Sequence, residues 1–172
     1  MGLLDSLKDV LNQYTSSSTQ NTANATQHFD QVAQAASPNV IAEGLSAVFH
    51  SDQTPAFGNL VGNLFSQSNG EQKAGMLNQL LASVGPGALT SLVGSGALAS
   101  LLGGGKQITP EQAQSVSPDM VQQIATHAEK TDPSIIDKAS QFYAEHPALI
   151  KTLGGAALSI ALAKVAERQK AA

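Results

Sequence analysis

Residues 74–105 constrain the fold most, because this stretch contains no charged side chain. It includes two nearly identical units, which begin at Gly87 and Gly96 and read Gly-Ala-Leu-Thr-Ser-Leu-Val-Gly and Gly-Ala-Leu-Ala-Ser-Leu-Leu-Gly. In each unit the apolar residues fall at helical spacing and a glycine closes the unit, which predicts two short helices over 86–93 and 96–102. Helices of this length are not stable alone in water. They must therefore be buried, either by the rest of the chain or by a neighbouring copy of it.

The composition predicts helices that pack closely through small side chains. Hydrophobic residues make up 42% of the 172-residue chain, but aromatic residues make up only 4% and there is no Trp. Charged residues amount to 13%, against about a quarter in a typical globular chain. The surface is therefore expected to be covered largely by Gln, Asn, Ser and Thr. Weak surface charge lowers the repulsion between copies, which favours self-association.

The distribution of charged and reactive residues excludes several classes of function. No Lys or Arg lies between Lys8 and Lys73, and the basic stripe that binding to nucleic-acid phosphates requires is missing, so nucleic acid is not an expected partner. The chain has no Cys, which excludes disulfides and thiolate metal sites. Asp5 and Asp9 interrupt the apolar start, unlike a secretory signal. We therefore expect a cytoplasmic protein.

The prolines predict an all-α fold. Each of the seven can occupy the first position of a helix, where its missing N–H group costs nothing. Thr54 and Thr109 precede two of them and are suited to capping, and Thr109-Pro-Glu-Gln reads as a capping box with Gln112 at the third helical position. The fold expected is a compact multi-helix bundle of short helices. Its predicted helices span 3–14, 27–36, 38–50, 55–67, 70–84, 86–93, 96–102, 110–115, 118–130, 133–145 and 147–169.

The clearest amphipathic helix is the first one, over residues 3–14. Its apolar stripe either docks on the core of its own chain, docks on a partner copy, or lies on a membrane surface. The Ser/Thr/Asn-rich stretch that follows has no large apolar residue and reads as a linker. The predicted organisation is thus a detached arm (1–15), a polar linker (16–26) and one helical domain (27–172).

The last predicted helix is apolar on nearly every side. Its uncharged run lies between Lys151 and Lys164, which is shorter than the roughly 20 apolar residues needed to cross a bilayer. Gly154, Ala157 and Ala161 give it a face of small residues that permits close approach of another backbone. A long apolar helix of this kind is typical of the centre of a bundle or of a contact between subunits.

No motif in the sequence indicates catalysis or a cofactor. The four histidines share no helix face at metal-binding spacing, so no metal site is predicted. Gly103-Gly-Gly-Lys106 lacks the spacing and the following hydroxyl residue of a phosphate-binding loop. The serines do not form the Gly-x-Ser-x-Gly motif. We therefore expect neither catalytic nor cofactor-binding residues, and the protein is not expected to be an enzyme.

Three features resemble the YidB-like family of small bacterial proteins of unknown function. They are the Met-Gly-Leu-Leu-Asp start, the Leu/Gly-rich middle, and a turn followed by Gln107-Ile-Thr-Pro-Glu-Gln112. The resemblance covers the start and residues 70–130, and the last forty residues have no counterpart in it. It implies a bacterial, helical, non-catalytic protein and supplies no catalytic residues.

These observations predict a non-catalytic structural or interaction protein that forms homo-oligomers or larger assemblies. The alternative is a peripheral membrane protein that binds lipid through its first and last helices, although the two acids and one base of the first helix are not what anionic lipid favours. The candidates for self-association are apolar or small residues from the first helix, the Leu-rich middle and the last helix. They are Leu3, Leu4, Leu7, Val10, Leu11, Tyr14, Leu89, Leu92, Leu98, Leu101, Gly154, Ala157 and Ala161.

Overall fold

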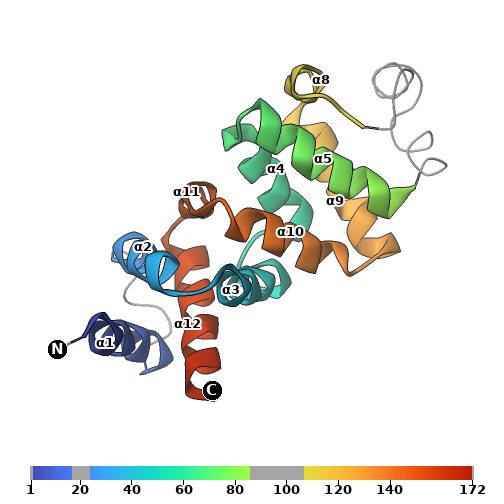
Figure 1. The fold of residues 1–172 in the computed structure, drawn as a ribbon. Helices are drawn as coiled ribbons and strands as arrows, with labels where there is room; N and C mark the ends of the chain where they lie inside the picture. Colours follow the sequence, from blue (N-terminus) through green and yellow to red (C-terminus); the bar gives the residue numbers. More distant parts are fainter. Residues whose placement is uncertain (1, 17–23, 86–106, 172) are drawn as a thin grey trace. The chain divides into compact units, whose positions relative to one another are not determined.

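The computed structural model describes residues 2–16, 24–85 and 107–171, and within these segments all regular secondary structure is helical (Figure 1). The predicted all-α fold is confirmed. The predicted helices 86–93 and 96–102 lie outside the described residues. The elements are α1 (Leu3–Ser16), α2 (Ala25–Ala35), α3 (Pro38–His50), α4 (Phe57–Gln67), α5 (Gly70–Val84), α8 (Pro110–Gln114), α9 (Pro118–Thr131), α10 (Ile135–Ala144), α11 (Pro147–Ile150), the 3-10 helix η1 (Lys151–Leu153) and α12 (Gly155–Ala171).

The chain divides into two compact units, and the division falls within α10. Unit 1 contains Met1–Pro55 and Ser140–Ala172, and unit 2 contains Ala56–Ala139. Residues 27–172 were expected in one helical domain, and in the structure they belong to both units. The reason is that α12 packs with α1, α2 and α3 from the start of the chain, a long-range return that no local pattern encodes.

In unit 1, α12 packs against α1, α2 and α3 (Figure 1). Leu45 and Val48 of α3 and Leu162 of α12 are fully buried. The two helices approach closely because Gly44 has no side chain: a Cβ atom there would lie 2.9 Å from the backbone carbonyl oxygen of Ala161. The face of small residues predicted on the last helix thus packs inside its own unit.

Two ion pairs add to the packing of unit 1. Lys151 Nζ lies 2.9 Å from Asp30 Oδ1 and so joins η1 to α2. Arg168 Nη1 lies 3.1 Å from Glu43 Oε1 and joins α12 to α3. All four side chains are partly exposed, so each pair contributes at most about 1 kcal/mol. The unit therefore depends mainly on its buried apolar contacts.

In unit 2, α9 packs against both α4 and α5, and α8 packs on α5 (Figure 1). Gly58 and Gly62 lie one turn apart on α4 and face the backbone of α9, where added Cβ atoms would meet the carbonyl oxygens of Gln122 at 2.7 Å and Pro118 at 3.2 Å. The core of this unit includes fully buried apolar side chains from all three long helices. They are Phe57, Leu60, Val61, Leu64, Phe65, Met76, Leu77, Leu80, Val121 and Ile124.

Polar contacts hold the residues that lead into α8, and the sequence predicted one of these contacts, the capping box. The Thr109 side chain accepts a hydrogen bond from the Gln112 backbone N–H, and the Gln112 side chain accepts one from the Thr109 N–H, so the predicted capping box is confirmed. Asn78 of α5 bonds both backbone groups of Ile108: its Oδ1 accepts from the N–H at 2.8 Å, and its Nδ2 donates to the carbonyl at 3.2 Å. The residues leading into α8 are therefore tied to α5.

The predicted continuous helix over 147–169 is wrong. The structure breaks it into α11, η1 and α12, and Gly154 stands between η1 and α12 with a φ of 94°. Only glycine adopts such a backbone conformation without a steric cost. The Thr152 hydroxyl donates to the Leu149 carbonyl at 2.6 Å, which satisfies an acceptor near the break. None of the helices in the described segments is long and apolar enough to cross a membrane.

The predicted detachment of the first helix is not confirmed. Helix α1 packs against α12 and α2 within unit 1, and Leu11 and Tyr14 are each only 4% exposed. Asp5, Lys8 and Asp9 are exposed. The burial of Leu11 and Tyr14 and the exposure of the charged residues agree with the amphipathic pattern.

Candidate interaction surfaces

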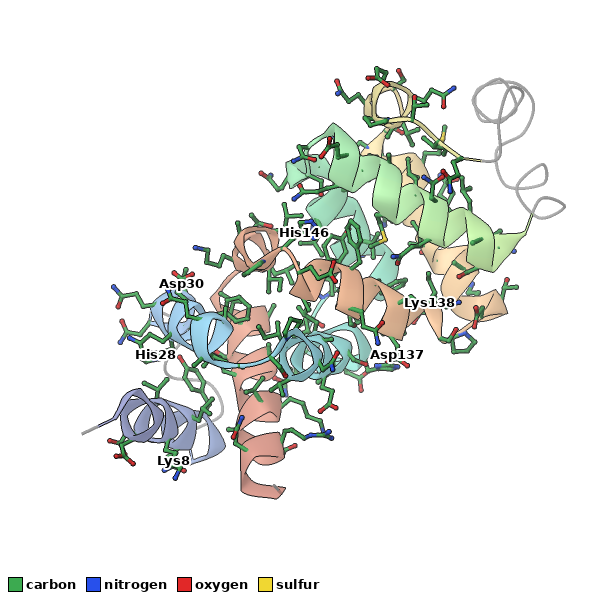
Figure 2. All side chains as sticks on the ribbon, in the orientation of Figure 1. Lys8, His28, Asp30, Asp137, Lys138 and His146 are labelled. Carbon is green, nitrogen blue, oxygen red and sulfur yellow. The ribbon has the colours of Figure 1, made fainter. Side chains whose placement is uncertain are left out.

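Helix α1 is fixed to unit 1 by a polar contact at the end of its apolar face. The Tyr14 hydroxyl lies 2.7 Å from His28 Nδ1 on α2, and the two rings meet edge to face with centroids 5.6 Å apart. Burial raises the pKa of the Tyr14 hydroxyl above its ordinary value of 10.0. Figure 2 labels His28 and Asp30 on α2 and Lys8 on α1. The sequence analysis did not foresee this pair, because nothing in the sequence relates Tyr14 to a residue fourteen positions later.

The predicted self-association residues fall into four groups: buried, half-buried, exposed and outside the described residues. Leu11, Tyr14, Ala157 and Ala161 are buried in the packing of unit 1, Val10 is half-buried, and Gly154 is exposed. The structure does not describe the side chains of Leu3, Leu4 and Leu7. Leu89, Leu92, Leu98 and Leu101 lie outside the described residues altogether.

A polar groove runs along one face of α9 in unit 2. It encloses about 560 Å3 and is lined by Asp119, Gln122, Gln123, Thr126, His127 and Lys130. Gln122 Nε2 donates a hydrogen bond to Asn59 Oδ1 of α4, and the Thr126 hydroxyl donates to the Gln122 carbonyl at 2.8 Å. Asp119 lies in the first turn of α9 and Lys130 in the last, where each charge complements the helix dipole. Gln122 thus joins α9 to α4, and the side chains that line the groove include no paired nucleophile and base.

Two histidines of the described segments contact a backbone carbonyl four residues earlier in the chain. His50 Nδ1 lies 2.8 Å from the Ser46 carbonyl oxygen, and His146 Nδ1 lies 2.8 Å from the Phe142 carbonyl oxygen. The sequence placed His146 at a helix junction, and the structure has it between α10 and α11 (Figure 2). Across residues 2–16, 24–85 and 107–171, no cluster of three or more His, Asp or Glu side chains could hold a metal ion.

Three buried polar atoms of the described residues have no hydrogen-bond partner. They are Gln79 Oε1, Ser83 Oγ and Tyr143 Oη. Gln79 and Ser83 lie one turn apart on α5, and both are partly exposed as whole residues. Tyr143 is fully buried, and burial raises its pKa far above the ordinary value. An unpartnered polar atom of this kind lowers stability.

Comparison of the chain with family models, curated proteins and solved structures gives no match. The resemblance to the YidB-like family thus remains an expectation from the sequence.

Proposed function

We propose that the protein is a non-catalytic helical interaction protein that forms homo-oligomers or larger assemblies through its Leu-rich middle segment, residues 86–105. The observation that carries this proposal is that four of the candidate residues on the first and last helices are buried within unit 1. Ala157 and Ala161 are buried in unit 1, where Ala161 contacts Gly44, and Leu11 and Tyr14 are buried by the docking of α1. The proposal therefore rests on the segment that the sequence marks most strongly for burial.

The chemistry of the middle segment supports the same proposal. It contains no charged residue and two similar Leu-containing units. An apolar helix too short to be stable alone gains its stability by burying its apolar face. Two copies of a repeated unit provide matched surfaces, and symmetric association of identical chains is the commonest form of assembly.

The experiment is to replace Leu92 and Leu101 by Asp together and to measure the particle mass by light scattering during size exclusion. We expect the mass to fall towards that of one chain while the circular dichroism stays helical. The matched control combines Ala82→Asp with Asn63→Asp, because both residues are exposed and the pair adds the same two charges outside the segment. A wild-type protein that is a single chain at high concentration would refute the proposal.

The test also separates self-association from binding to a lipid surface. The structure favours self-association over lipid binding, because Leu11 and Tyr14 of the amphipathic helix are covered by their own unit and are not available to lipid. Flotation with vesicles of phosphatidylcholine and phosphatidylglycerol, combined with a single-chain mass without lipid, would favour the membrane alternative instead.

A further inference from the structure

Asn69 and Gly70 form the only Asn-Gly dipeptide in the sequence. Asn69 is exposed and is the N-cap of α5, and Gly70 is the first residue of that helix. An asparagine followed by glycine is chemically labile, because no side chain shields the glycine nitrogen from the asparagine side chain. We propose that Asn69 is a site of spontaneous deamidation whose rate is set by the opening of the α5 cap.

The reaction needs no reagent other than water. The backbone nitrogen of Gly70 loses its proton and attacks Asn69 Cγ, so that a new C–N bond closes a five-membered succinimide ring. The bond from Cγ to Nδ2 then breaks, and ammonia leaves. Water opens the ring at either of its two carbonyl carbons, which yields aspartate or isoaspartate.

The folded structure holds the reacting groups in an unreactive arrangement. Asn69 Oδ1 accepts a hydrogen bond from the Gln72 backbone N–H at 2.9 Å, and the Gln72 side chain accepts one from the Asn69 N–H at 3.0 Å. The carboxamide must leave Gln72 before Cγ can approach the Gly70 nitrogen. Gly70 is itself packed on α8, since a Cβ atom there would lie 2.8 Å from Gln114 Nε2 and 3.3 Å from Pro110 Cβ. The cap therefore has to open for the reaction to proceed.

The two products have opposite effects on the helix. Aspartate is as good an N-cap as asparagine, and its negative charge is favourable at the positive end of the helix. Isoaspartate adds one methylene group to the backbone between the cap and Gly70. That extra length displaces Gly70 from α8 and separates Asn69 from both of its Gln72 partners. Only the second product disrupts the start of α5.

The experiment measures deamidation by peptide mapping after incubation of the full chain at mildly alkaline pH, in buffer and in urea. We expect Asn69 to be modified in both and to react more slowly in buffer, by a factor on the order of ten, because the cap protects it. Gln72→Ala removes the reciprocal half of the capping box and is expected to raise the rate in buffer only. Gln67→Ala, on the exposed end of α4, is the control and leaves both rates unchanged.

Three outcomes would overturn the proposal. If Asn69 stays unmodified in urea, the dipeptide is not labile. The same conclusion follows if Asn63, which is exposed but precedes Leu, is modified at the same rate as Asn69. Equal rates in buffer and urea would show that the cap gives no protection. Asn69→Ser keeps a capping hydroxyl but has no side-chain amide. If this variant stays helical and yields no modified peptide, Asn69 is confirmed as the reacting residue.

Discussion

Two tyrosine hydroxyl groups of this chain have contrasting environments. Tyr14 Oη is bonded to His28 Nδ1 at 2.7 Å, whereas Tyr143 Oη is buried with no hydrogen-bond partner among the described residues. Replacement by phenylalanine removes the hydroxyl in both cases and keeps the ring. The two variants therefore form a matched pair.

We expect Tyr143→Phe to leave the free energy of unfolding unchanged or to raise it by about 1–3 kcal/mol, since the cost of an unpartnered buried hydroxyl is removed. Tyr14→Phe is expected to lower it by about 1 kcal/mol, because a satisfied hydrogen bond is lost. Urea unfolding of both variants measures the difference. A large loss of stability in Tyr143→Phe would mean that this hydroxyl has a partner in the native protein.

Tyr143 also makes the stability of the protein depend on pH. Burial raises the pKa of Tyr143 above its ordinary value of 10.0, so the unfolded chain loses this proton at a lower pH than the folded chain does. Unfolding then releases a proton, and rising pH favours it. We expect stability to fall above pH 10.0, less steeply in Tyr143→Phe than in the wild type.

Asp132 allows the pH dependence of stability to be tested at acidic pH. Hydrogen bonds from the side chain of Ser134 and from Lys138 lower the pKa of its carboxyl group below 3.8; Ser134 Oγ lies 2.6 Å and its backbone N 3.1 Å from Asp132 Oδ1. A lowered folded pKa stabilises the protein above the unfolded pKa, and this contribution disappears as pH falls through the folded pKa.

We therefore expect Asp132→Asn to lower the melting temperature at neutral pH and to have a smaller effect at a pH well below 3.8, the ordinary carboxyl pKa. Ser134→Ala removes the main cause of the shift, so the double variant should lose less than the two single variants combined. An effect of Asp132→Asn that does not change with pH would contradict the assignment.

At the scale of the elements, the helix boundaries show what a sequence can predict. Helices α3, α8, α9 and α11 begin at their prolines as expected, but α4 begins at Phe57 rather than at Pro55. The Thr54 hydroxyl donates to the Val48 carbonyl at 2.6 Å and so caps the end of α3 instead of the start of α4. Thr54 is equally suited to either role, and only the three-dimensional path of the chain decides between them.

The break at Gly154 illustrates the same limit. The sequence predicts Gly154 on a small-residue helix face, because its spacing to Ala157 and Ala161 is helical. A glycine tolerates both helical and positive φ angles, so the residue type alone does not distinguish a packing contact from a break. The packing contact lies at Ala161 and Gly44.

The close contact between α4 and α9 gives an element-scale prediction. A Cβ atom at Gly58 would lie 2.2 Å from Thr126 Oγ1 and 2.7 Å from the Gln122 carbonyl oxygen. We expect Gly58→Ala to destabilise unit 2 by about 1–3 kcal/mol through overpacking, even though alanine is about 1 kcal/mol better than glycine in a helix. Thermal unfolding measures the effect.

Gly62→Ala is the control for this substitution. The nearest atom there, the Pro118 carbonyl oxygen, would be 3.2 Å away, so the steric cost and the gain in helix propensity nearly cancel. A Gly58→Ala variant as stable as the Gly62→Ala variant would show that α4 and α9 are not packed this closely.

At the scale of the whole molecule, the two units differ in how the chain forms them. Unit 2 is one continuous segment with its own buried core from α4, α5 and α9. Unit 1 needs both ends of the described chain, since α12 packs against α1, α2 and α3. The sequence predicted the helices of both units but not this division, because the core residues of the two units are of the same types.

The continuity of unit 2 predicts that it folds alone. We expect residues 56–139, expressed as a separate protein, to be helical and to unfold cooperatively in urea. Residues 1–55 alone lack α12 and serve as the control, which is expected to stay largely unfolded. A disordered 56–139 fragment would show that unit 2 depends on the rest of the chain.

The discontinuity of unit 1 also dictates when it is able to form during translation. Ribosomes add about 5–20 residues per second and release the N-terminal part of a chain first, so α3 emerges several seconds before α12 is made. During that interval unit 2 is synthesised in full, while the faces of Ile41, Leu45 and Val48 have no partner to cover them. A nascent chain of residues 1–139, followed by a flexible linker long enough to bring residue 139 out of the ribosome, should therefore contain a protease-resistant unit 2 behind a protease-sensitive N-terminal segment that binds chaperones.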